Sequence, residues 1–353
     1  SQSLITFDMN SLKREEVQVH YMEPILPDQY MGMKTSEIAH LVHNKIQEEI
    51  NNSNRNDPKP ACLCISLHYT KKKKTPKHTY TMGIVQWYTL AQEMEDPYYL
   101  QIRQGIETFC EQNNISVCRI FKTDWQNTDQ LPEVDGLLCV GKFTEQEAAR
   151  FRQHTKKLVF LDMDTPHPTD NTITLDFEHA VKDILCYLQS LGHMHIGYLG
   201  GQEILADGTL YPDPRKKWLL AFSEQFNLTI QPYLREGAFT SQSGYEMMKS
   251  LLQNEKRPSA VFCASDPIAI GALHALQEAG LCVPQDLSVV GFDDISAAKF
   301  TNPPLTTIHA PAHWMGVYGA SLLYHVLSHH AEPMPIKATL PCQLIERSSC
   351  RPL

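Results

Sequence analysis

From residue 81 onward, short apolar runs alternate with segments whose apolar residues recur every three or four positions. The runs are typical of buried parallel strands, and the periodic segments are typical of helices packed on a sheet. This pattern predicts strands near residues 81–88, 116–121, 134–140 and 157–163. A helix is predicted from Asp96-Pro97 to Asn113, because Asp is a favoured N-cap and Pro is tolerated in the first helical turn. These elements make up one doubly wound unit.

The same alternation starts again after Thr174, which predicts a second unit of the same kind. Helices are expected from Phe177 to Leu191 and from Pro214 to Phe226, and strands near 195–199, 230–235, 260–264 and 287–292. The sequence therefore predicts an α/β fold with two doubly wound parallel-sheet subdomains. Two such units would leave a cleft between them, which is a common place for a small-molecule site.

Charge is unevenly distributed along the chain, which carries a net charge of −9. Residues 1–67 hold six basic and nine acidic residues, residues 68–80 hold five lysines and no acid, and residues 81–353 hold 20 basic and 31 acidic residues. An acidic body repels nucleic acid, so any DNA contact is expected in the basic linker 68–80. The candidate phosphate contacts are Lys71, Lys72, Lys73 and Lys74. A solvated spacer is an equally good interpretation of this linker.

Several classes of protein lack support in the sequence. There is no apolar run of 18 residues and no secretory leader, so a cytoplasmic chain without membrane contact is expected. The ten cysteines are scattered, which favours reduced thiols and predicts no metal site. No nucleophile elbow, phosphate-cradling loop or zinc-protease motif occurs, so neither an enzyme nor a cofactor is predicted.

Polar and aromatic side chains follow the predicted strands, where a parallel sheet builds its ligand site. Planar charged groups engage vicinal sugar hydroxyls with paired hydrogen bonds, and aromatic rings stack on the apolar faces of the sugar. The candidates are Trp87, Tyr98, Asp162, Arg215, Phe239, Ser265 and Asp293. Tyr88 and Tyr99 are equally well explained as core aromatics, and Asp294 as a cap of its own turn. The sequence thus indicates a carbohydrate site.

A set of motifs resembles the LacI/GalR family of sugar-responsive transcription repressors over about residues 68–349. The motifs include Asp96-Pro-Tyr-Tyr-Leu-Gln-Ile-Arg-Gln-Gly-Ile106, Leu191-Gly-His-Met-His-Ile-Gly-Tyr-Leu-Gly-Gly201 and the stretch from Cys263 to Asp294. Within the family, Gln86 to Glu107 most resembles repressors of β-galactosidase operons of the evolved β-galactosidase type. The resemblance implies a galactoside or related sugar as effector, bound by the seven candidates above. Two further family contact positions are Ala310 and Ala312, which cannot hydrogen-bond through their side chains.

The resemblance also implies an architecture like that of type I periplasmic binding proteins. One subdomain would comprise 81–174 with about 308–335, and the other 175–307 with about 336–349. The helix 313–328 and the strand near 338–346 would cross back to complete both sheets. Family members pair through these cores, and no heptad tail follows Ser349, so a homodimer is expected.

The chain departs from the family pattern in residues 1–67, where a helix-turn-helix is usual. Lys34-Thr-Ser-Glu-Ile-Ala-His-Leu-Val42 is only loosely similar to a first helix, and the hinge after Tyr69 lacks a wedge leucine. Three interpretations stay open: a diverged DNA-binding head, a replaced head, or a sequence altered by an insertion or a frameshift. The leading hypothesis is a repressor that binds a sugar and operator DNA. The alternative is a DNA-independent sugar sensor of the same bilobal fold.

Overall fold

The computed structural model describes residues 80–126, 131–328 and 334–353. By its internal contacts the chain divides into residues 1–76 and 77–353, and all described residues belong to the second unit. The atypical segment 1–67, residues 68–79 of the basic linker and the four candidate lysines lie outside the described residues.

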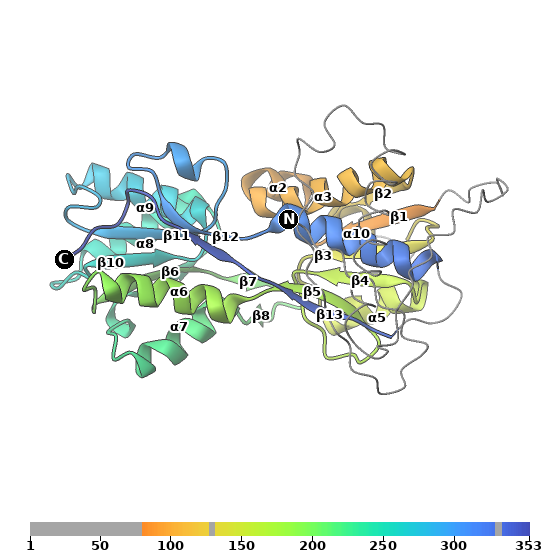
Figure 1. The fold of residues 1–353 in the computed structure, drawn as a ribbon, viewed down its shortest axis with the longest axis horizontal. Helices are drawn as coiled ribbons and strands as arrows, with labels where there is room; N and C mark the ends of the chain where they lie inside the picture. Colours follow the sequence, from red (N-terminus) through yellow and green to blue (C-terminus); the bar gives the residue numbers. More distant parts are fainter. Residues whose placement is uncertain (1–79, 127–130, 329–333) are drawn as a thin grey trace, which may run out of the picture. The chain divides into compact units, whose positions relative to one another are not determined.

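A parallel sheet forms the centre of the first lobe, with its described strands in the order β13-β5-β4-β3-β1-β2. Its strands are β1 (Thr81–Gln86), β2 (Ser116–Ile120), β3 (Gly136–Val140), β4 (Leu158–Leu161), β5 (Asn171–Leu175) and β13 (Lys337–Leu340). Its helices are α2 (Leu90–Glu95), α3 (Pro97–Asn113), α4 (Lys122–Gln126), α5 (Glu145–His154) and α10 (Ala312–Ser328). Figure 1 shows these elements around one sheet.

A second sheet of the same kind forms the second lobe, in the order β14-β12-β11-β10-β6-β9, with only the β12–β14 pair antiparallel among its described strands. Its strands are β6 (Ile196–Gly201), β9 (Leu234–Gly237), β10 (Ala260–Cys263), β11 (Ser288–Asp293), β12 (Thr306–His309) and β14 (Gln343–Ile345). Its helices are α6 (Phe177–Ser190), α7 (Pro214–Gln225), α8 (Ser241–Leu252) and α9 (Asp266–Glu278), with short 3-10 turns η3 (Gln231–Tyr233) and η4 (Ala298–Phe300). A small hairpin, β7 (Glu203–Ile204) with β8 (Leu210–Tyr211), extends from this lobe.

Two doubly wound parallel sheets confirm the predicted fold class. The helix predicted from Asp96-Pro97 begins at Pro97, and the Asp96 side chain accepts a hydrogen bond from the Tyr98 N–H, as an N-cap does. The strand predicted at 230–235 is partly wrong, because η3 occupies 231–233 and β9 begins only at Leu234. Proline at position 232 cannot donate to a sheet ladder, which is the physical reason for the later start.

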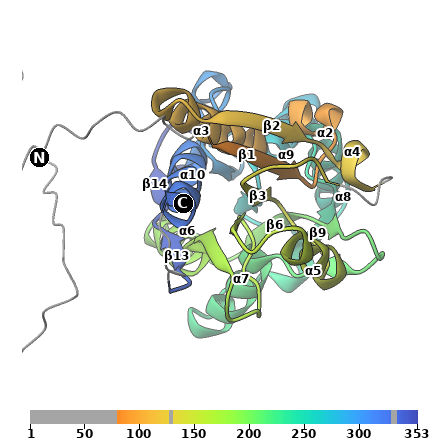
Figure 2. The same cartoon turned by 90° about the vertical axis from the view of Figure 1, so that its right-hand side faces the viewer.

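The chain passes between the lobes at three places in the described residues: after β5, after β12 and after β13 (Figures 1 and 2). One boundary from the sequence therefore needs correction. Residues 337–340 were assigned to the second subdomain, but β13 pairs in parallel with β5 of the first lobe. What appeared as a single strand near 338–346 is two short strands, one completing each sheet, and Leu340 to Gln343 makes the crossing between them.

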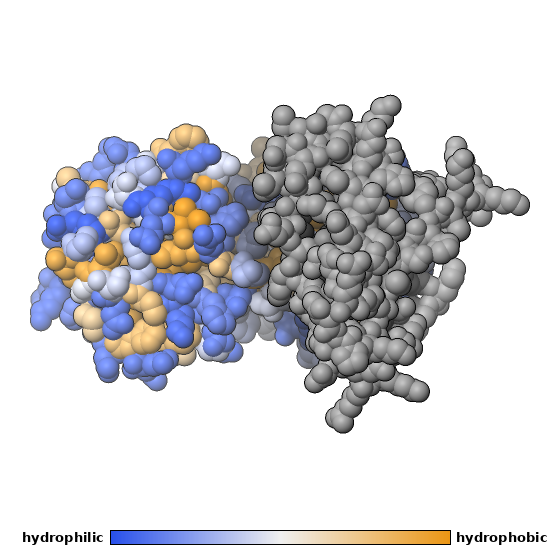
Figure 3. Space-filling model, in the orientation of Figure 1, coloured by the Kyte–Doolittle hydropathy of each residue, from blue (hydrophilic) through white to orange (hydrophobic). Residues whose placement is uncertain are grey.

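Helices pack closely where glycine removes the side chain. A Cβ added to Gly105 on α3 would lie 1.9 Å from the His313 carbonyl oxygen of α10, and one on Gly316 of α10 would lie 2.0 Å from the Ile102 carbonyl oxygen of α3. No helix in the described ranges has both the length and the apolar content that crossing a bilayer demands. Hydrophilic residues predominate on the face of the second lobe visible in Figure 3, with apolar residues in patches.

Candidate functional site

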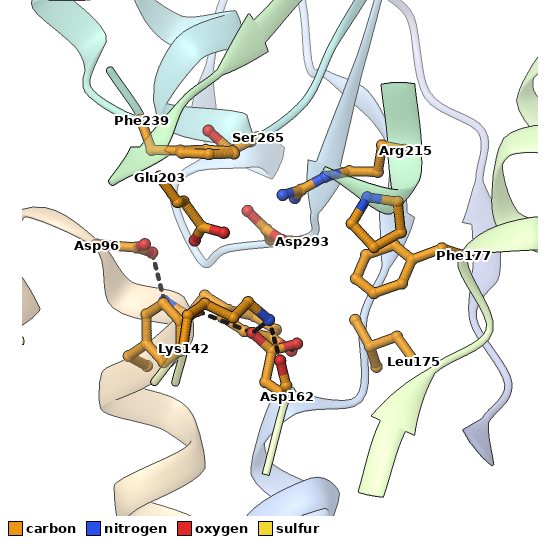
Figure 4. Close-up of a pocket in the computed structure, with 13 residues that line it drawn as sticks. Asp96, Lys142, Asp162, Leu175, Phe177, Glu203, Arg215, Phe239, Ser265 and Asp293 are labelled. Atoms are coloured by element: carbon orange, nitrogen blue, oxygen red, sulfur yellow. Dashed lines mark hydrogen bonds and ion pairs between the residues drawn. The ribbon is translucent and has the colours of Figure 1, made fainter. Parts of the chain in front are cut away.

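A pocket lies between the two lobes, at the carboxyl ends of strands from both sheets (Figure 4). The space between its walls is about 440 Å³ when the open solvent at its mouth is included. The lining residues are Asp96, Tyr98, Tyr99, Lys142, Asp162, Leu175, Phe177, Glu203, Pro214, Arg215, Phe239, Ser265 and Asp293. Loops after parallel strands meet here because all the strands of each lobe that bear on the pocket point the same way.

On the first-lobe side, the carboxylate of Asp162 has a complete set of partners. Asp162 directly follows β4 and has a φ of 65°, a left-handed conformation that Asp tolerates better than most residues. The hydroxyls of Tyr98 and Tyr99 donate to its two oxygens at 3.1 and 2.8 Å. The ammonium of Lys142 lies 2.6 Å from Oδ2 and also donates to the Asp162 backbone carbonyl. The network fixes this side of the pocket before any ligand arrives.

Lys142 is a buried cation that follows β3 through Gly141. Burial alone would lower the pKa of its ammonium, but the charges of Asp162 and Glu203 raise it above the ordinary value. Its Nζ also lies 5.1 Å from the ring centre of Tyr211, which belongs to the hairpin of the second lobe. Lys142 therefore contacts both sides of the pocket.

On the second-lobe side, the Arg215 guanidinium is fixed among rings and acceptors. Its Nε donates to Asp213 Oδ1 at 2.9 Å, and its Nη1 donates to the Ala264 carbonyl oxygen at 2.8 Å. The guanidinium carbon lies 4.8 Å from the ring centre of Phe239 and 5.5 Å from that of Phe177. A planar cation between aromatic faces is held in one orientation. Within the described residues its Nη2 has no acceptor, so it is available to a ligand.

Asp293, the last residue of β11, is the counterpart of Asp162 without its partners. It is only 6% exposed and has a φ of 107°. No hydrogen bond or ion pair joins its carboxylate to any residue that the structure describes. Burial raises the pKa of Asp293 well above the ordinary value, and nearby Asp266 and Asp96 raise it further. Because Asp293 lines the pocket, a ligand bound there can supply the donors that its carboxylate lacks.

Two more acids face the same space. Burial raises the pKa of Asp96 to about 6 and that of Glu203, on the hairpin, to about 7. Figure 4 shows Glu203, Asp293 and Arg215 directed into one gap between the lobes. In the described ranges no group of three or more His, Cys, Asp or Glu side chains is placed to hold a metal ion. The arrangement suits a small molecule rich in hydrogen-bond donors.

Six of the seven residues proposed from sequence lie together in this pocket: Tyr98, Asp162, Arg215, Phe239, Ser265 and Asp293. Trp87 does not line it; its ring stacks on Tyr88 at 4.7 Å and meets the pocket-lining Tyr99 edge-on at 6.0 Å. Asp294 points elsewhere, since it pairs with Arg347 at 2.6 Å and His309 at 3.2 Å.

Sequence reasoning missed Asp96, Lys142 and Glu203 as pocket residues. Asp96 was interpreted only as a helix cap, which it also is. Lys142 and Glu203 each follow a glycine-containing end of a buried strand, so the rule used for Asp162 and Asp293 would have found them.

Comparison with known proteins identifies relatives for most of the chain. Residues 185–350 match a family model described as a periplasmic binding protein-like domain. The regulator GalR of Streptococcus thermophilus is 37% identical over 71% of this chain and 76% of its own length. The repressor MelR of Bacillus subtilis is 34% identical over 76% of this chain and 78% of its own. The repressor PurR of Yersinia enterocolitica is 30% identical over 91% of this chain and 94% of its own, so that match includes part of residues 1–67.

Solved structures show the same fold. The complex of the transcriptional regulator CelR with cellobiose has a TM-score of 0.67 at 22% identity, covering 76% of this chain and 84% of that one. The lac repressor dimer bound to operator and the anti-inducer ONPF has a TM-score of 0.66 at 25% identity, covering 78% of this chain and 96% of that one.

Proposed function

The chain belongs to the LacI/GalR family of transcriptional regulators, and from that premise we propose a sugar-responsive repressor whose effector is a galactoside or a related sugar. It is accordingly a regulator and not an enzyme. One observation carries the proposal: Arg215 and Asp293 face the same pocket. A guanidinium offers paired donors and a carboxylate paired acceptors, which together suit vicinal hydroxyls.

The aromatic residues of the pocket support a carbohydrate over other polar ligands. Phe239 and Phe177 present rings beside Arg215, so a flat apolar face can stack while hydroxyls at its edge bond to charged groups. A galactoside is the favoured sugar because the stretch from Gln86 to Glu107 resembles repressors of β-galactosidase operons. The CelR complex is an example of a regulator of this fold that binds a sugar, cellobiose.

Operator binding is proposed through residues that precede the described core. The PurR match reaches into residues 1–67, which favours a diverged DNA-binding head over a replaced one. The basic linker, with Lys71 to Lys74, carries the charge needed to contact phosphates. The lac repressor structure, a dimer on its operator, supports pairing of two such chains.

The proposed mechanism follows from the two lobes sharing one pocket. Three segments connect the lobes, so the angle between them can change without unfolding either sheet. A sugar that contacts both Arg215 on the second lobe and the Asp162 network on the first binds one angle more tightly than others. That difference in affinity is the free energy available to change how a dimer holds DNA.

A gel shift tests the proposal, using the full chain and the DNA upstream of its own gene, at low salt, with and without galactosides. We expect a shifted band whose intensity changes with sugar. Arg215→Ala should retain DNA binding but lose the sugar response, whereas Lys217→Ala, an exposed cation on the same helix, should behave like the native chain. No shift under any condition would refute the repressor and leave the DNA-independent sensor.

A further inference from the structure

Acidic groups outnumber basic ones around the pocket. Four carboxyl groups line it, those of Asp96, Asp162, Glu203 and Asp293, against two cations, Lys142 and Arg215. Only Asp162 forms an ion pair with one of these cations. Arg215 pairs instead with Asp213, which does not line the pocket. Both cations are therefore already matched by the protein's own acids.

The charge of Arg215 acts on each of the other three carboxyl groups, and that of Lys142 also acts on Glu203, but only at longer range than an ion pair. Asp96, Glu203 and Asp293 form no ion pair with any residue in the described ranges. The Asp293 carboxylate also lacks a hydrogen bond, although the residue is more than nine-tenths buried. What this space offers a ligand is acceptors and negative charge.

Helix N-termini commonly bind phosphate, but those at this pocket are capped by side chains of the protein. Four helices, α3, α6, α7 and α9, begin at the pocket. Their first-turn N–H groups donate to the protein's own caps, which are Asp96 at 3.1 Å, Asp176 at 3.1 Å, Asp213 at 2.9 Å and Ser265 at 3.4 Å. A proline among the first two residues of α3, α7 and α9 removes a further donor from each.

From this arrangement we propose that the pocket selects its sugar by charge, accepting a free sugar and excluding the phosphorylated or carboxylated form of the same sugar. The proposal rests on the proposed function, because it concerns the effector of that pocket. A hydroxyl can donate to the open carboxylates, whereas a phosphate or a carboxylate brings only further acceptors and charge of the same sign.

The selection places the effector in a reaction sequence. The effector must be supplied by a step that leaves the sugar unphosphorylated, such as hydrolysis of a glycoside or uptake without modification. Phosphoryl transfer from a nucleoside triphosphate breaks the bond between the γ-phosphorus and its bridging oxygen and forms a P–O bond to the sugar oxygen. The nucleoside diphosphate leaves, and the sugar hydroxyl releases its proton. A kinase of that class would convert the effector into a phosphorylated sugar that the pocket excludes.

The expected discrimination is large. Like charges roughly 8 Å apart in surroundings with an effective dielectric constant near 20 weaken binding about 30-fold per pair. A sugar phosphate carries about −1.5 to −2 charges at neutral pH, so an affinity loss of about 100-fold or more is expected. The loss should grow with pH, because burial raises the pKa of Asp96 to about 6 and that of Glu203 to about 7, and both lose their protons over that range.

Other ionisable groups near Asp96 and Glu203 also contribute to the electrostatic potential in the pocket. The groups whose charge or hydrogen bond acts on Asp96 or Glu203 are Tyr88, Lys142, Asp162, Asp213, Arg215 and Asp293. Burial raises the pKa of Tyr88 well above its ordinary value, and Lys142 and Arg215 have raised pKa values, so the tyrosine stays neutral and both cations stay charged from pH 6 to 8.

The test is calorimetry on the full chain with matched ligands: galactose, galactose 6-phosphate and galacturonate, with glucose, ribose and cellobiose as further free sugars. We expect a free sugar to bind and its anionic forms to bind about 100-fold more weakly. Galacturonate keeps a constant charge from pH 6 to 8, so the ratio of galactose affinity to galacturonate affinity should increase as the pH rises. An anionic form that bound as tightly as the free sugar would overturn charge selection and leave the sugar-responsive regulator standing. If no free sugar bound, the proposed function itself would fail.

Two variants connect the discrimination to the acids. Glu203→Gln and Asp96→Asn remove charge with little change in shape, and Asn still caps α3. In the double variant, galacturonate affinity should recover at least about 10-fold relative to galactose. Glu246→Gln, an exposed acid on α8, is the matched control and should leave the ratio unchanged. A ratio that stayed the same in the double variant would refute the role of these carboxylates.

Discussion

The two sides of the pocket use the same residue type in opposite ways. Asp162 and Asp293 each stand at the end of a central strand, one in each lobe, and each has a positive φ. The Asp162 carboxylate receives hydrogen bonds from Tyr98, Tyr99 and Lys142, whereas the Asp293 carboxylate receives none from the described residues. One acid is completed by the protein, and the other is left for a ligand to complete.

This contrast assigns different tasks to the lobes. The first lobe offers a surface whose shape is set in advance, because its acid, its two tyrosines and its lysine hold one another in place. The second lobe offers groups with unused hydrogen-bonding capacity, Asp293 and one nitrogen of Arg215. Ligand recognition should therefore depend most on the second lobe, and stability of the free pocket most on the first.

The largest expected effect comes from breaking the first-lobe network. Lys142→Met removes the cation beside Asp162 and leaves a buried carboxylate without its ion pair, since both side chains are 5% exposed. The free energy of unfolding should fall by about 3–5 kcal/mol, measured by chemical denaturation. Adding Asp162→Asn removes the stranded charge and should restore most of the loss. If the single variant were as stable as the native chain, the network would not fix this side.

Removing the open acid of the second lobe should give the reverse pattern. Asp293→Asn keeps a residue that tolerates positive φ but lacks the charge. Sugar affinity should fall about 30- to 100-fold by calorimetry, the effect of losing charged hydrogen bonds worth about 2–3 kcal/mol. Stability without sugar should stay level or rise, because an unpartnered buried acid is gone. Asp294→Asn is the matched control: it breaks the pair with Arg347, so it should cost stability and spare affinity.

Glu203 allows a test by pH. Its folded-state pKa of about 7 lies above the ordinary value of 4.5, so the neutral carboxyl costs nothing at low pH and ionisation destabilises the fold as pH rises from about 4.5 to above 7. Glu203→Gln should match native stability at about pH 4 and exceed it by about 1–3 kcal/mol at pH 8, as followed by thermal unfolding. The exposed control Glu246→Gln should show no such divergence. Equal pH profiles for the native chain and Glu203→Gln would contradict the raised pKa.

The smallest effect concerns single hydrogen bonds within the first-lobe network. Tyr99→Phe removes the hydroxyl that donates to Asp162 at 2.8 Å and should lower stability by about 1 kcal/mol. Tyr98→Phe removes the longer bond of 3.1 Å and should cost no more. If both tyrosine variants lower the free energy of unfolding much less than Lys142→Met does, the ion pair is the dominant interaction of the network. If either tyrosine variant lowers it more than Lys142→Met does, that hydrogen bond is the dominant one.

Much of the fold could be predicted from local pattern. Alternating apolar runs and helical periodicity located most of the central strands, and Asp96-Pro97 marked the start of α3 to the residue. Short elements at the edges were less accessible. The hairpin β7–β8 has two residues per strand, too few to show a period, and η3 replaced the start of a strand where Pro232 cannot join a ladder.

The candidate site also has residues that the sequence could identify and residues that it could not. Strand-end chemistry identified Arg215 and Asp293 because each charged residue stands next to an apolar run. It could not distinguish Asp162 from Asp293, since both look alike in sequence. Nor could it exclude Trp87, whose ring packs against Tyr88 and Tyr99 and does not line the pocket.

What the sequence determined by itself is the alternation of strands and helices, and with it the edge of each sheet where polar residues collect. Periodicity is local, and a chain of buried strands with capped helices has few ways to fold. Only the tertiary structure decided which of those polar residues are partners. Lys142 meets Asp162 across 20 residues of sequence, and the Asp293 carboxylate accepts no hydrogen bond from the described residues. Such pairings depend on how separate strands and two lobes are brought together, and that information is absent from any single stretch of the chain.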